Sequence, residues 1–307
     1  MAAASPPART GPDPIGGVYV VASSTLFAAV AVLGRFVRRE GFPVSSVLAT
    51  RFAICALLLL GLLVVLRRSL RPAPGERTAL VGLGVAGYGV ESGFYFAALG
   101  YATAAPVTLL FYTYPVIVAL GMWAIGKGRP TRRTITALVF GVLGAVIIVT
   151  LGGGEVRLET LGVVFALCSA TAYSAYLIGA DRLLSRTDPL VSAMWVSGSA
   201  AAGHAAFAVV TGRVVVPAGW DQWGPIIGMG VFTAAAFAFL FVGLRRLGAV
   251  RTAIVSSTEP LAVSLLALAF LGETIGLGIA IGGILVVTAA IIASVARIAP
   301  TTEPQMP

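Results

Sequence analysis

Charged residues are scarce in this chain. Only 11% of its 307 residues are Asp, Glu, Lys or Arg, whereas a soluble protein carries about 25%. Hydrophobic residues make up 58% of the chain, and the mean hydropathy is +0.97. Such a low fraction of charged residues excludes a soluble protein with a single hydrophobic core, and it predicts a polytopic membrane protein.

Histidine and cysteine are also rare, with one and two copies respectively. A single histidine, His204, gives histidine-based metal or triad chemistry little to build on. Cys55 and Cys168 fall within apolar segments, where cysteine behaves as a small hydrophobe, so we expect no disulfide framework. Residues 82–87, GLGVAG, match the dinucleotide fingerprint, but no βαβ unit surrounds them, and helix packing explains these glycines better. We predict no cofactor and no metal site.

The apolar segments between the charges are long enough to cross a bilayer, which takes about 20 residues. Helices satisfy their backbone groups internally, and a barrel strand would need only about ten alternating residues. We therefore predict an all-α integral membrane fold with ten transmembrane helices. Gly278-x-x-x-Gly282 and Gly224-x-x-x-Gly228 predict close-packed helix faces. The ten helices are expected at residues 15–34, 43–66, 79–99, 104–126, 133–152, 159–180, 190–212, 222–244, 250–271 and 274–296.

The sequence repeats itself about 145 residues apart. Pro115 in LLFYTYPVIVALGMW lies at the position of Pro260 in IVSSTEPLAVSLLAL, and Gly17 corresponds to Gly162 with the same offset. Duplication of an apolar unit is typical of secondary transporters. Five helices per copy is an odd number, so the second copy must enter the membrane from the opposite side. The sequence therefore predicts two inverted five-helix repeats.

The two repeats are assigned to residues 15–152 and 159–297. Residues 1–14 hold proline and small side chains without the apolar segment of a signal peptide, and are expected to form a disordered cytoplasmic tail. Residues 298–307 are expected to form a second short polar tail. The connections between the predicted helices are too short for an additional soluble domain.

The net charge of +9 and the pI near 10.2 are explained by membrane topology better than by nucleic-acid binding. Loops on one side of the predicted helices hold most of the arginines, and basic loops stay on the cytoplasmic side. This bias predicts a multi-pass protein of the plasma membrane with both termini in the cytoplasm. The cluster Arg35, Arg38 and Arg39 runs against the bias.

Two longer segments resemble the repeats of a known family. Residues 94–126, FYFAALGYATAAPVTLLFYTYPVIVALGMWAIG, and residues 240–273, LFVGLRRLGAVRTAIVSSTEPLAVSLLALAFLGE, each have a short corner followed by an apolar helix with a central proline. They are similar to the two EamA repeats of the drug/metabolite transporter superfamily, and the resemblance covers about residues 15–297. It implies a carrier that exports small metabolites, often amino acids or related amphipathic compounds, from a central cavity between the halves.

The two copies differ in two of their motif positions. The first copy has Gly126-Lys127 where the second has Gly272-Glu273, and the second has Ser197 where the first has Arg51. The resemblance also implies that the substrate lies between the first, third and fourth helices of each copy.

Four ionisable side chains lie well inside the predicted helices, namely Arg51, Glu91, His204 and Glu259. Charge at membrane depth costs about 2.5–3.5 kcal/mol on insertion scales and usually faces a cavity or a partner. Glu91 is the strongest candidate, because Tyr88 and Tyr95 lie on its helix face at i−3 and i+4. It would bind a substrate ammonium or carry a proton; the alternative is a protonated structural acid bonded to a neighbouring helix.

Glu259 precedes Pro260, which removes the helical hydrogen bond to the carbonyl of Ser256. Glu259 and Ser256 are therefore candidates for substrate contact or for satisfying freed backbone groups, with equal weight. Pro260 and its counterpart Pro115 are predicted hinges. Near Pro115, Tyr112 is a candidate for stacking on a substrate ring, although buried aromatic packing is the commoner explanation.

Arg51 and His204 are interpreted mainly as structural or gating residues. Arg51 needs an anion at its depth, and pairing with one of the glutamates is favoured over capture of a substrate carboxylate. Small residues around His204 predict close helix packing and a cross-helix hydrogen bond, with proton relay as the less favoured alternative.

The sequence as a whole predicts a secondary-active or facilitative carrier that works by alternating access and is not an enzyme. Its expected partners are a small-molecule substrate and the lipid bilayer, with protons as a candidate coupling ion; the sequence does not determine the oligomeric state. A membrane-embedded enzyme acting on a lipid and a non-transporting scaffold subunit are the alternatives. The enzyme would need clustered acids or histidines, which this chain does not offer.

Overall fold

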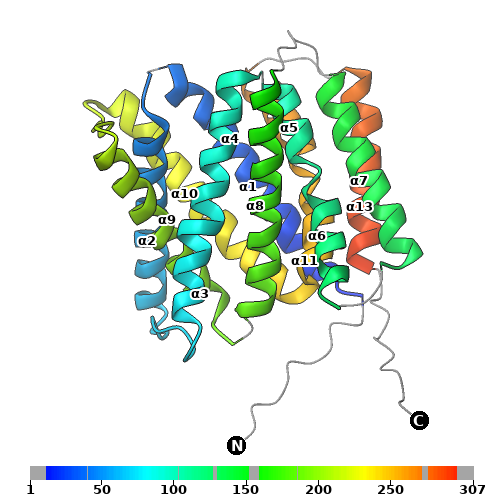
Figure 1. Ribbon diagram of the computed structural model, residues 1–307, viewed down its shortest axis with the longest axis horizontal. Helices are drawn as coiled ribbons and strands as arrows, with labels where there is room; N and C mark the ends of the chain where they lie inside the picture. Colours follow the sequence, from blue (N-terminus) through cyan, green and yellow to red (C-terminus); the bar gives the residue numbers. More distant parts are fainter. Residues whose placement is uncertain are drawn as a thin grey trace, which may run out of the picture.

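The computed structural model is a bundle of helices (Figure 1). It describes residues 12–39, 41–102, 104–126, 130–151, 159–184, 186–271 and 276–295. Within these ranges the regular secondary structure is helical and contains no strand, which confirms the all-α prediction. The predicted tails, except residues 12–14, and the motif residues Lys127 and Glu273 lie outside the described residues.

The helices follow the chain in two sets that correspond to the predicted repeats. The first set consists of α1 (Pro14–Arg39), α2 (Val44–Val65), α3 (Arg77–Gly82), η1 (Leu83–Gly89), α4 (Val90–Tyr101), α5 (Ala104–Phe111), α6 (Tyr114–Ala124) and α7 (Arg132–Thr150). The second set consists of α8 (Thr160–Leu183), α9 (Pro189–Val210), α10 (Trp220–Leu247), α11 (Ala249–Ser256), α12 (Glu259–Leu271) and α13 (Leu277–Val295).

Nine helical stretches of the described chain are long and apolar enough to cross a membrane. The predicted helix 79–99 is not among them, because it is divided into α3, η1 and α4. η1 is a π-helix, in which each backbone hydrogen bond spans one more residue than in an α-helix. The membrane fold is therefore confirmed, with nine such spans in the described residues rather than the predicted ten.

The predicted continuous helices 104–126 and 250–271 are both broken. The first is interrupted at 112–113, between α5 and α6, and the second at 257–258, between α11 and α12. These two breaks are separated by the same 145 residues as the repeats, and each lies just before a proline, Pro115 or Pro260. A proline has no N–H for the helical hydrogen bond and clashes with the preceding turn, so the helix restarts at this point.

A threonine closes each break in the same way. The Thr113 hydroxyl donates to the Leu110 carbonyl (2.7 Å), and the Thr258 hydroxyl donates to the Val255 carbonyl (2.9 Å). Each of these carbonyls also accepts from the backbone N–H of the same threonine (3.2 and 3.1 Å), so the hydroxyl adds a second hydrogen bond at each break. The two repeats therefore share a side-chain device as well as a backbone shape.

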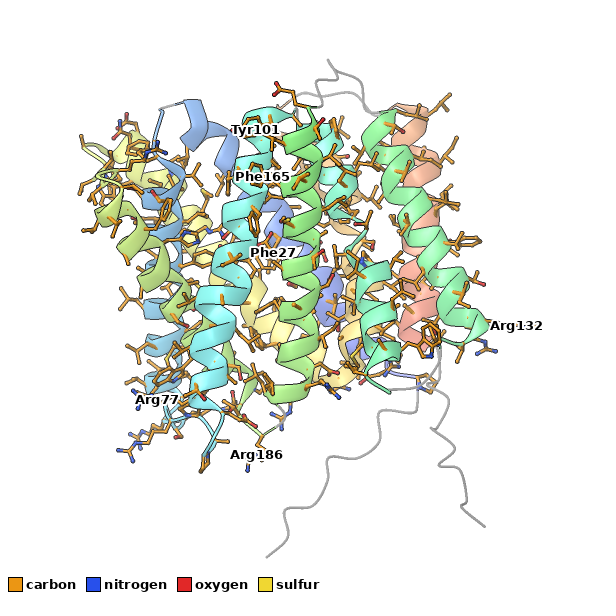
Figure 2. All side chains as sticks on the ribbon, in the orientation of Figure 1. Phe27, Arg77, Tyr101, Arg132, Phe165 and Arg186 are labelled. Carbon is orange, nitrogen blue, oxygen red and sulfur yellow. The ribbon has the colours of Figure 1, made fainter. Side chains whose placement is uncertain are left out.

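The two repeats run through the bundle in opposite directions. α1 begins beside Asp13, whose N–H donates to the Ser294 carbonyl near the end of α13 (3.0 Å); this is named the terminal end. α8 begins beside Glu159, whose N–H donates to the Tyr101 carbonyl at the end of α4 (3.1 Å); this is named the distal end. Figure 2 shows Tyr101 at the upper, distal end and Arg132 and Arg186 at the lower, terminal end. The equivalent helices α1 and α8 thus start at opposite ends, as in an inverted repeat.

Helices of opposite repeats pack in matched pairs. α1 packs on α10, and its counterpart α8 packs on α4; α2 packs on its own counterpart α9, and α7 on its counterpart α13. The α2–α9 pair lies at one edge of the bundle and the α7–α13 pair at the other (Figure 1). This pairing relates the two repeats by an approximate two-fold axis.

Aliphatic side chains cover much of the outside, and aromatic rings fill the inside. Val210 and Leu277 are 85% and 80% exposed, as expected for side chains that face lipid. The largest side chains with less than 2% exposure include Tyr114, Tyr176 and Phe52. Because tyrosine needs a hydrogen-bond partner when buried, this interior is more polar than the lipid-facing surface.

Glycines allow α7 and α13 to pack closely. A Cβ added to Gly282 of α13 would lie 2.6 Å from the Gly144 carbonyl oxygen of α7, so the two backbones touch. Gly278 faces α7 in the same way, which confirms the predicted packing face 278–282. The prediction for Gly224 is wrong, because a Cβ there would have no atom within 4 Å.

Replacing Gly282 by leucine should destabilise the protein by roughly 1–3 kcal/mol, because the new side chain must push two backbones apart. Thermal unfolding of the purified protein in detergent would measure this loss. Gly61→Leu is the matched control, because Gly61 lies within α2 and has open space around it. Equal unfolding temperatures for the two variants would contradict the close α7–α13 contact.

Candidate functional site at the centre of the bundle

Glu91 is buried in α4, with 7% of its surface exposed. The hydroxyl of Ser169 on α8 donates to its Oε1 atom (3.2 Å). A carboxylate in an apolar bundle needs such donors or a positive charge nearby. Ser169 supplies the hydrogen-bond donor, and a residue of α2 supplies the positive charge.

Arg51 of α2 is also buried, with 8% exposure, and its guanidinium carbon lies 4.4 Å from the ring centroid of Phe52. Its electrostatic neighbours are Tyr88, Cys55 and Glu91. An arginine keeps its charge at this depth only if anions, π faces or carbonyls surround it. Glu91 is the carboxylate among these neighbours; no direct ion pair joins the two described side chains, and Arg51 acts on Glu91 as a nearby positive charge.

His204 of α9 completes this side of the site. Its Nε2 atom lies 3.1 Å from the Ser92 hydroxyl oxygen of α4, which is the cross-helix hydrogen bond that its small neighbours predict. Its ring stacks on Phe52 at a centroid distance of 6.0 Å and an interplanar angle of 10°. Phe52 therefore contacts both the imidazole of His204 and the guanidinium of Arg51.

Tyr88 and Tyr95, which were predicted to flank Glu91, contact different groups. Tyr88 lies in the π-helix η1 and makes edge contacts with Phe52 (5.3 Å) and Phe237 (5.1 Å). The hydroxyl of Tyr95 lies 3.1 Å from that of Thr108 on α5. The i−3 and i+4 spacing assumed a regular α-helix, and η1 changes the register immediately before Glu91.

Glu259 is the first residue of α12 and lies at the break of that helix. It is half-buried, and within the described part of the chain no group donates a hydrogen bond to its carboxylate. Tyr112, Tyr114 and Tyr173 are its electrostatic neighbours. Glu259 thus differs from Glu91, which has both a hydroxyl donor and a cation.

The two broken helices meet through Tyr114, the residue that corresponds to Glu259 in the first repeat. The Tyr114 hydroxyl donates to the Ala253 carbonyl of α11 (3.2 Å), and its side chain also hydrogen-bonds Ser256. The Ser174 hydroxyl of α8 donates to the Tyr114 carbonyl (3.2 Å). The predicted residue Ser256 therefore supports this tyrosine at the contact between the breaks.

A cluster of aromatic rings joins the Glu91 side of the site to the Glu259 side. Tyr173 of α8 lies 4.9 Å from Tyr114 and 6.4 Å from Tyr88 between ring centroids. Tyr112 lies 6.0 Å from Tyr114. The structure thus brings Arg51, Tyr88, Glu91, Tyr112, His204, Ser256 and Glu259 into one region, together with the helix breaks at Pro115 and Pro260.

The sequence-based analysis missed the contribution of α8. Ser169, Tyr173 and Tyr176 follow each other at i, i+4 and i+7, so they share one helix face, and that face borders the site. This spacing could have identified them. In the parts of the chain that the structure describes, no three His, Cys, Asp or Glu side chains are grouped as metal ligands.

Comparison with known families identifies the family of this chain. The model of the EamA-like transporter family matches residues 14–150 and again residues 160–295. The chain belongs to the EamA-like transporter family. The two matches coincide with the two inverted sets of helices, so the resemblance of the sequence segments to EamA repeats is confirmed.

This EamA-like transporter is similar to other proteins over most of its length. A protein of Archaeoglobus fulgidus described as an uncharacterized transporter is 28% identical, and the match covers 91% of this chain and 96% of the relative. The uncharacterized transporter YcbK of Bacillus subtilis is 26% identical, with coverage of 85% and 87%. A solved crystal structure with 20% identity has a TM-score of 0.79 and matches 92% of this chain, which shows a shared fold.

The nearby charges of Arg51 and Glu91 predict non-additive effects of substitution. Arg51→Met should lower stability by about 3–5 kcal/mol, because it leaves Glu91 buried without its cation. The double variant Arg51→Met/Glu91→Gln should recover most of this loss. The measurement is thermal unfolding in detergent, with the exposed Arg133→Met as the control for loss of an arginine. Losses that simply add in the double variant would contradict this coupling.

Proposed function

We propose that this EamA-like transporter is a secondary carrier for small amphipathic metabolites that works by alternating access. The observation that supports it most is the meeting of two broken helices from opposite repeats, with Tyr114 and Glu259 at the breaks. Broken helices at membrane depth are tolerated where they serve a binding site between repeats. Pro115 and Pro260 are the proposed hinges, since each helix restarts at its proline.

A set of hydrogen bonds and ion pairs closes the terminal end; it is named the latch and joins residues 67–76 to residues 186–188. The buried Glu76 accepts hydrogen bonds from the backbone N–H groups of Arg186 (3.2 Å) and Thr187 (3.0 Å) and from the Thr187 hydroxyl. Arg68 and Asp188 add an exposed ion pair (3.1 Å). The latch connects the two repeats, so it must break for this end to open.

A second tie at the terminal end joins α1 to α10. Asp13 accepts from the Arg246 guanidinium (2.9 and 3.1 Å) and from the Gly16 N–H (2.9 Å). Partial burial acts to raise the pKa of Asp13, but the bonds from Arg246 and Gly16 outweigh it and lower that pKa. This tie is complete above the pKa of an unfolded aspartate and is lost as the pH falls through the lowered pKa.

At the distal end, the described contact between α2 and the segment after α9 consists of hydrogen bonds without an ion pair. There the Ser46 hydroxyl of α2 donates to the Arg213 carbonyl (2.6 Å) and accepts from the Val215 N–H (3.1 Å). No charged side chain takes part in this contact. We therefore propose that the structure represents a state ready to open at the distal end.

The distribution of arginines supports a cytoplasmic terminal end. Figure 2 shows Arg77, Arg132 and Arg186 at this end, and basic residues stay on the cytoplasmic side. The described segments of the chain end on the same side, so we propose that both termini are cytoplasmic. Export would then proceed from the latched end to the distal end.

A direct flux assay tests the carrier proposal. Protein reconstituted in liposomes would be assayed with amino acids, nucleosides, polyamines, organic acids and cationic dyes, after thermal-shift screening of the same compounds in detergent. A bound ligand stabilises the folded state by about 2.7 kcal/mol at a hundredfold excess over Kd. Flux of at least one class above empty liposomes is expected. Absence of flux for every class would favour a non-transporting scaffold subunit.

If protons drive transport, the carboxylates of Glu91 and Glu259 are the groups that carry them. The double variant Glu91→Gln/Glu259→Gln should then lose the pH dependence of flux, since a glutamine binds no proton at these positions. Flux would be measured across a range of imposed pH gradients, with Asp221→Asn at the distal end as the control. Unchanged pH dependence in the double variant would reject proton coupling through these residues.

Removing the latch should favour opening at the terminal end. Glu76→Ala leaves the N–H groups of Arg186 and Thr187 without their acceptor, so the buried Ser192 beside them should become accessible. Ser192→Cys, in a background of Cys55→Ala and Cys168→Ala, would be labelled with N-ethylmaleimide. We expect labelling to be faster by at least about tenfold, as a loss of more than 1.4 kcal/mol requires.

Two variants serve as controls for the latch experiment. Asp221→Asn removes an exposed carboxylate at the opposite end and should leave the labelling of Ser192→Cys unchanged. Glu76→Gln retains an acceptor oxygen and should give an intermediate rate. Equal labelling rates of Ser192→Cys with and without Glu76→Ala would show that the latch does not control access to this position.

A further inference from the structure

The buried Glu91 and the half-buried Glu259 have different partners. Glu91 accepts from Ser169 and has Arg51 among its electrostatic neighbours, whereas Glu259 has neither a hydroxyl donor nor a cation from the described residues. One guanidinium and two carboxylates therefore share one region of the membrane interior. If both carboxylates are ionised, the region has one negative charge in excess.

An excess charge at this depth is costly, so a cation must accompany it. The basic side chains near the terminal end are held elsewhere, for example Arg246 by Asp13 and Arg186 by Glu76. His204 is bonded to Ser92 on the Arg51 side of the site. The compensating positive charge at Glu259 must therefore come from outside the described chain, as a proton or as part of the substrate.

The surroundings of Glu259 fit an organic cation. Tyr114 contacts the end of the helix that precedes Glu259, since its hydroxyl donates to the Ala253 carbonyl of α11. The rings of Tyr112 and Tyr173 contact Tyr114, so a cluster of three tyrosines lies at this helix break. Aromatic faces attract ammonium groups, and tyrosine rings also accept the apolar body of an amphipathic molecule. A zwitterion would bring a second negative charge with it and would leave the excess charge in place.

We infer that the site takes an organic monocation with an aromatic or apolar body, whose ammonium group pairs with Glu259. In this arrangement Glu91 is a positioning residue, held by Arg51 and Ser169, and does not touch the substrate charge. The inference rests on the proposed carrier function, and it names both the substrate class and the carboxylate that selects it.

Three compounds that share one ring and differ in charge test the inference: phenethylamine, phenylalanine and phenylacetate. Thermal shifts of the purified full-length protein in detergent would give their affinities at one pH and one salt concentration. We expect phenethylamine to bind more tightly than the zwitterion and the anion. Glu259→Gln should weaken amine binding about 10–100-fold, as loss of a charge-assisted hydrogen bond does.

Glu91→Gln and Glu259→Asp are the informative companions. Glu91→Gln should retain amine binding, because Glu259 still pairs with the ammonium group, but it should reduce the preference over phenylalanine, because the excess negative charge is removed. Glu259→Asp should retain the preference with reduced affinity, because the charge remains. Asp221→Asn controls for loss of a remote carboxylate. Each variant is compared at its own unfolding temperature without ligand, so a general loss of stability is not mistaken for a loss of binding.

Three outcomes would overturn the assignment: tighter binding of phenylalanine or phenylacetate, unchanged amine binding in Glu259→Gln, or no shift with any of the three compounds. These outcomes are distinguishable from failure of the carrier function. In each of them, flux of another compound class into liposomes would leave the carrier proposal intact. Absence of all flux, with amine binding through Glu259 preserved, would leave a binding protein that does not transport.

Discussion

The permanent charge of Arg51, buried in an apolar bundle, is the constraint on which the rest of the site depends. Four helices contribute to its accommodation: Phe52 from α2 lies under the guanidinium, Tyr88 and Glu91 approach from η1 and α4, and α8 supports Glu91 through Ser169. Because a charge at membrane depth needs partners, each of these groups has to be placed by helix packing. The charge of Arg51 therefore determines which side chains surround it and how the helices that hold them are arranged.

The two repeats have the same backbone plan but different side chains at equivalent positions. Both have a broken helix closed by a threonine, yet Tyr114 occupies the position of Glu259, and Ser197 is the counterpart of Arg51. A symmetric backbone lets two halves exchange positions during transport. Asymmetric side chains confine the charge to particular places, so the binding chemistry need not follow the symmetry of the motion.

The helices, their duplication and the short list of buried charges could be predicted from the sequence, because a bilayer requires long apolar segments and penalises charge. The breaks near Pro115 and Pro260 were anticipated as weak points but not as complete interruptions. Tyr95 lies one turn after Glu91 in the regular helix α4, but its hydroxyl bonds Thr108 of α5, which could not be predicted before the facing helix was known. The π-helix η1 changes the register of Tyr88 relative to Glu91. The spacing of Ser169, Tyr173 and Tyr176 on one face of α8 could have identified them, but the partner of Ser169 becomes known only when the facing helix is placed.

The contact between Gly144 and Gly282 fixes one edge of the bundle. Two backbones in direct contact along α7 and α13 cannot move closer, and they lose packing if they separate. In the proposed alternating access, this edge is therefore the axis about which the two halves turn. The opposite edge, at α2 and α9, then travels furthest for a given rotation (Figure 1). The latch and the Ser46 hydrogen bonds lie near that edge, far from the axis. A few hydrogen bonds there therefore oppose the rotation of the two halves more effectively than bonds near α7 and α13.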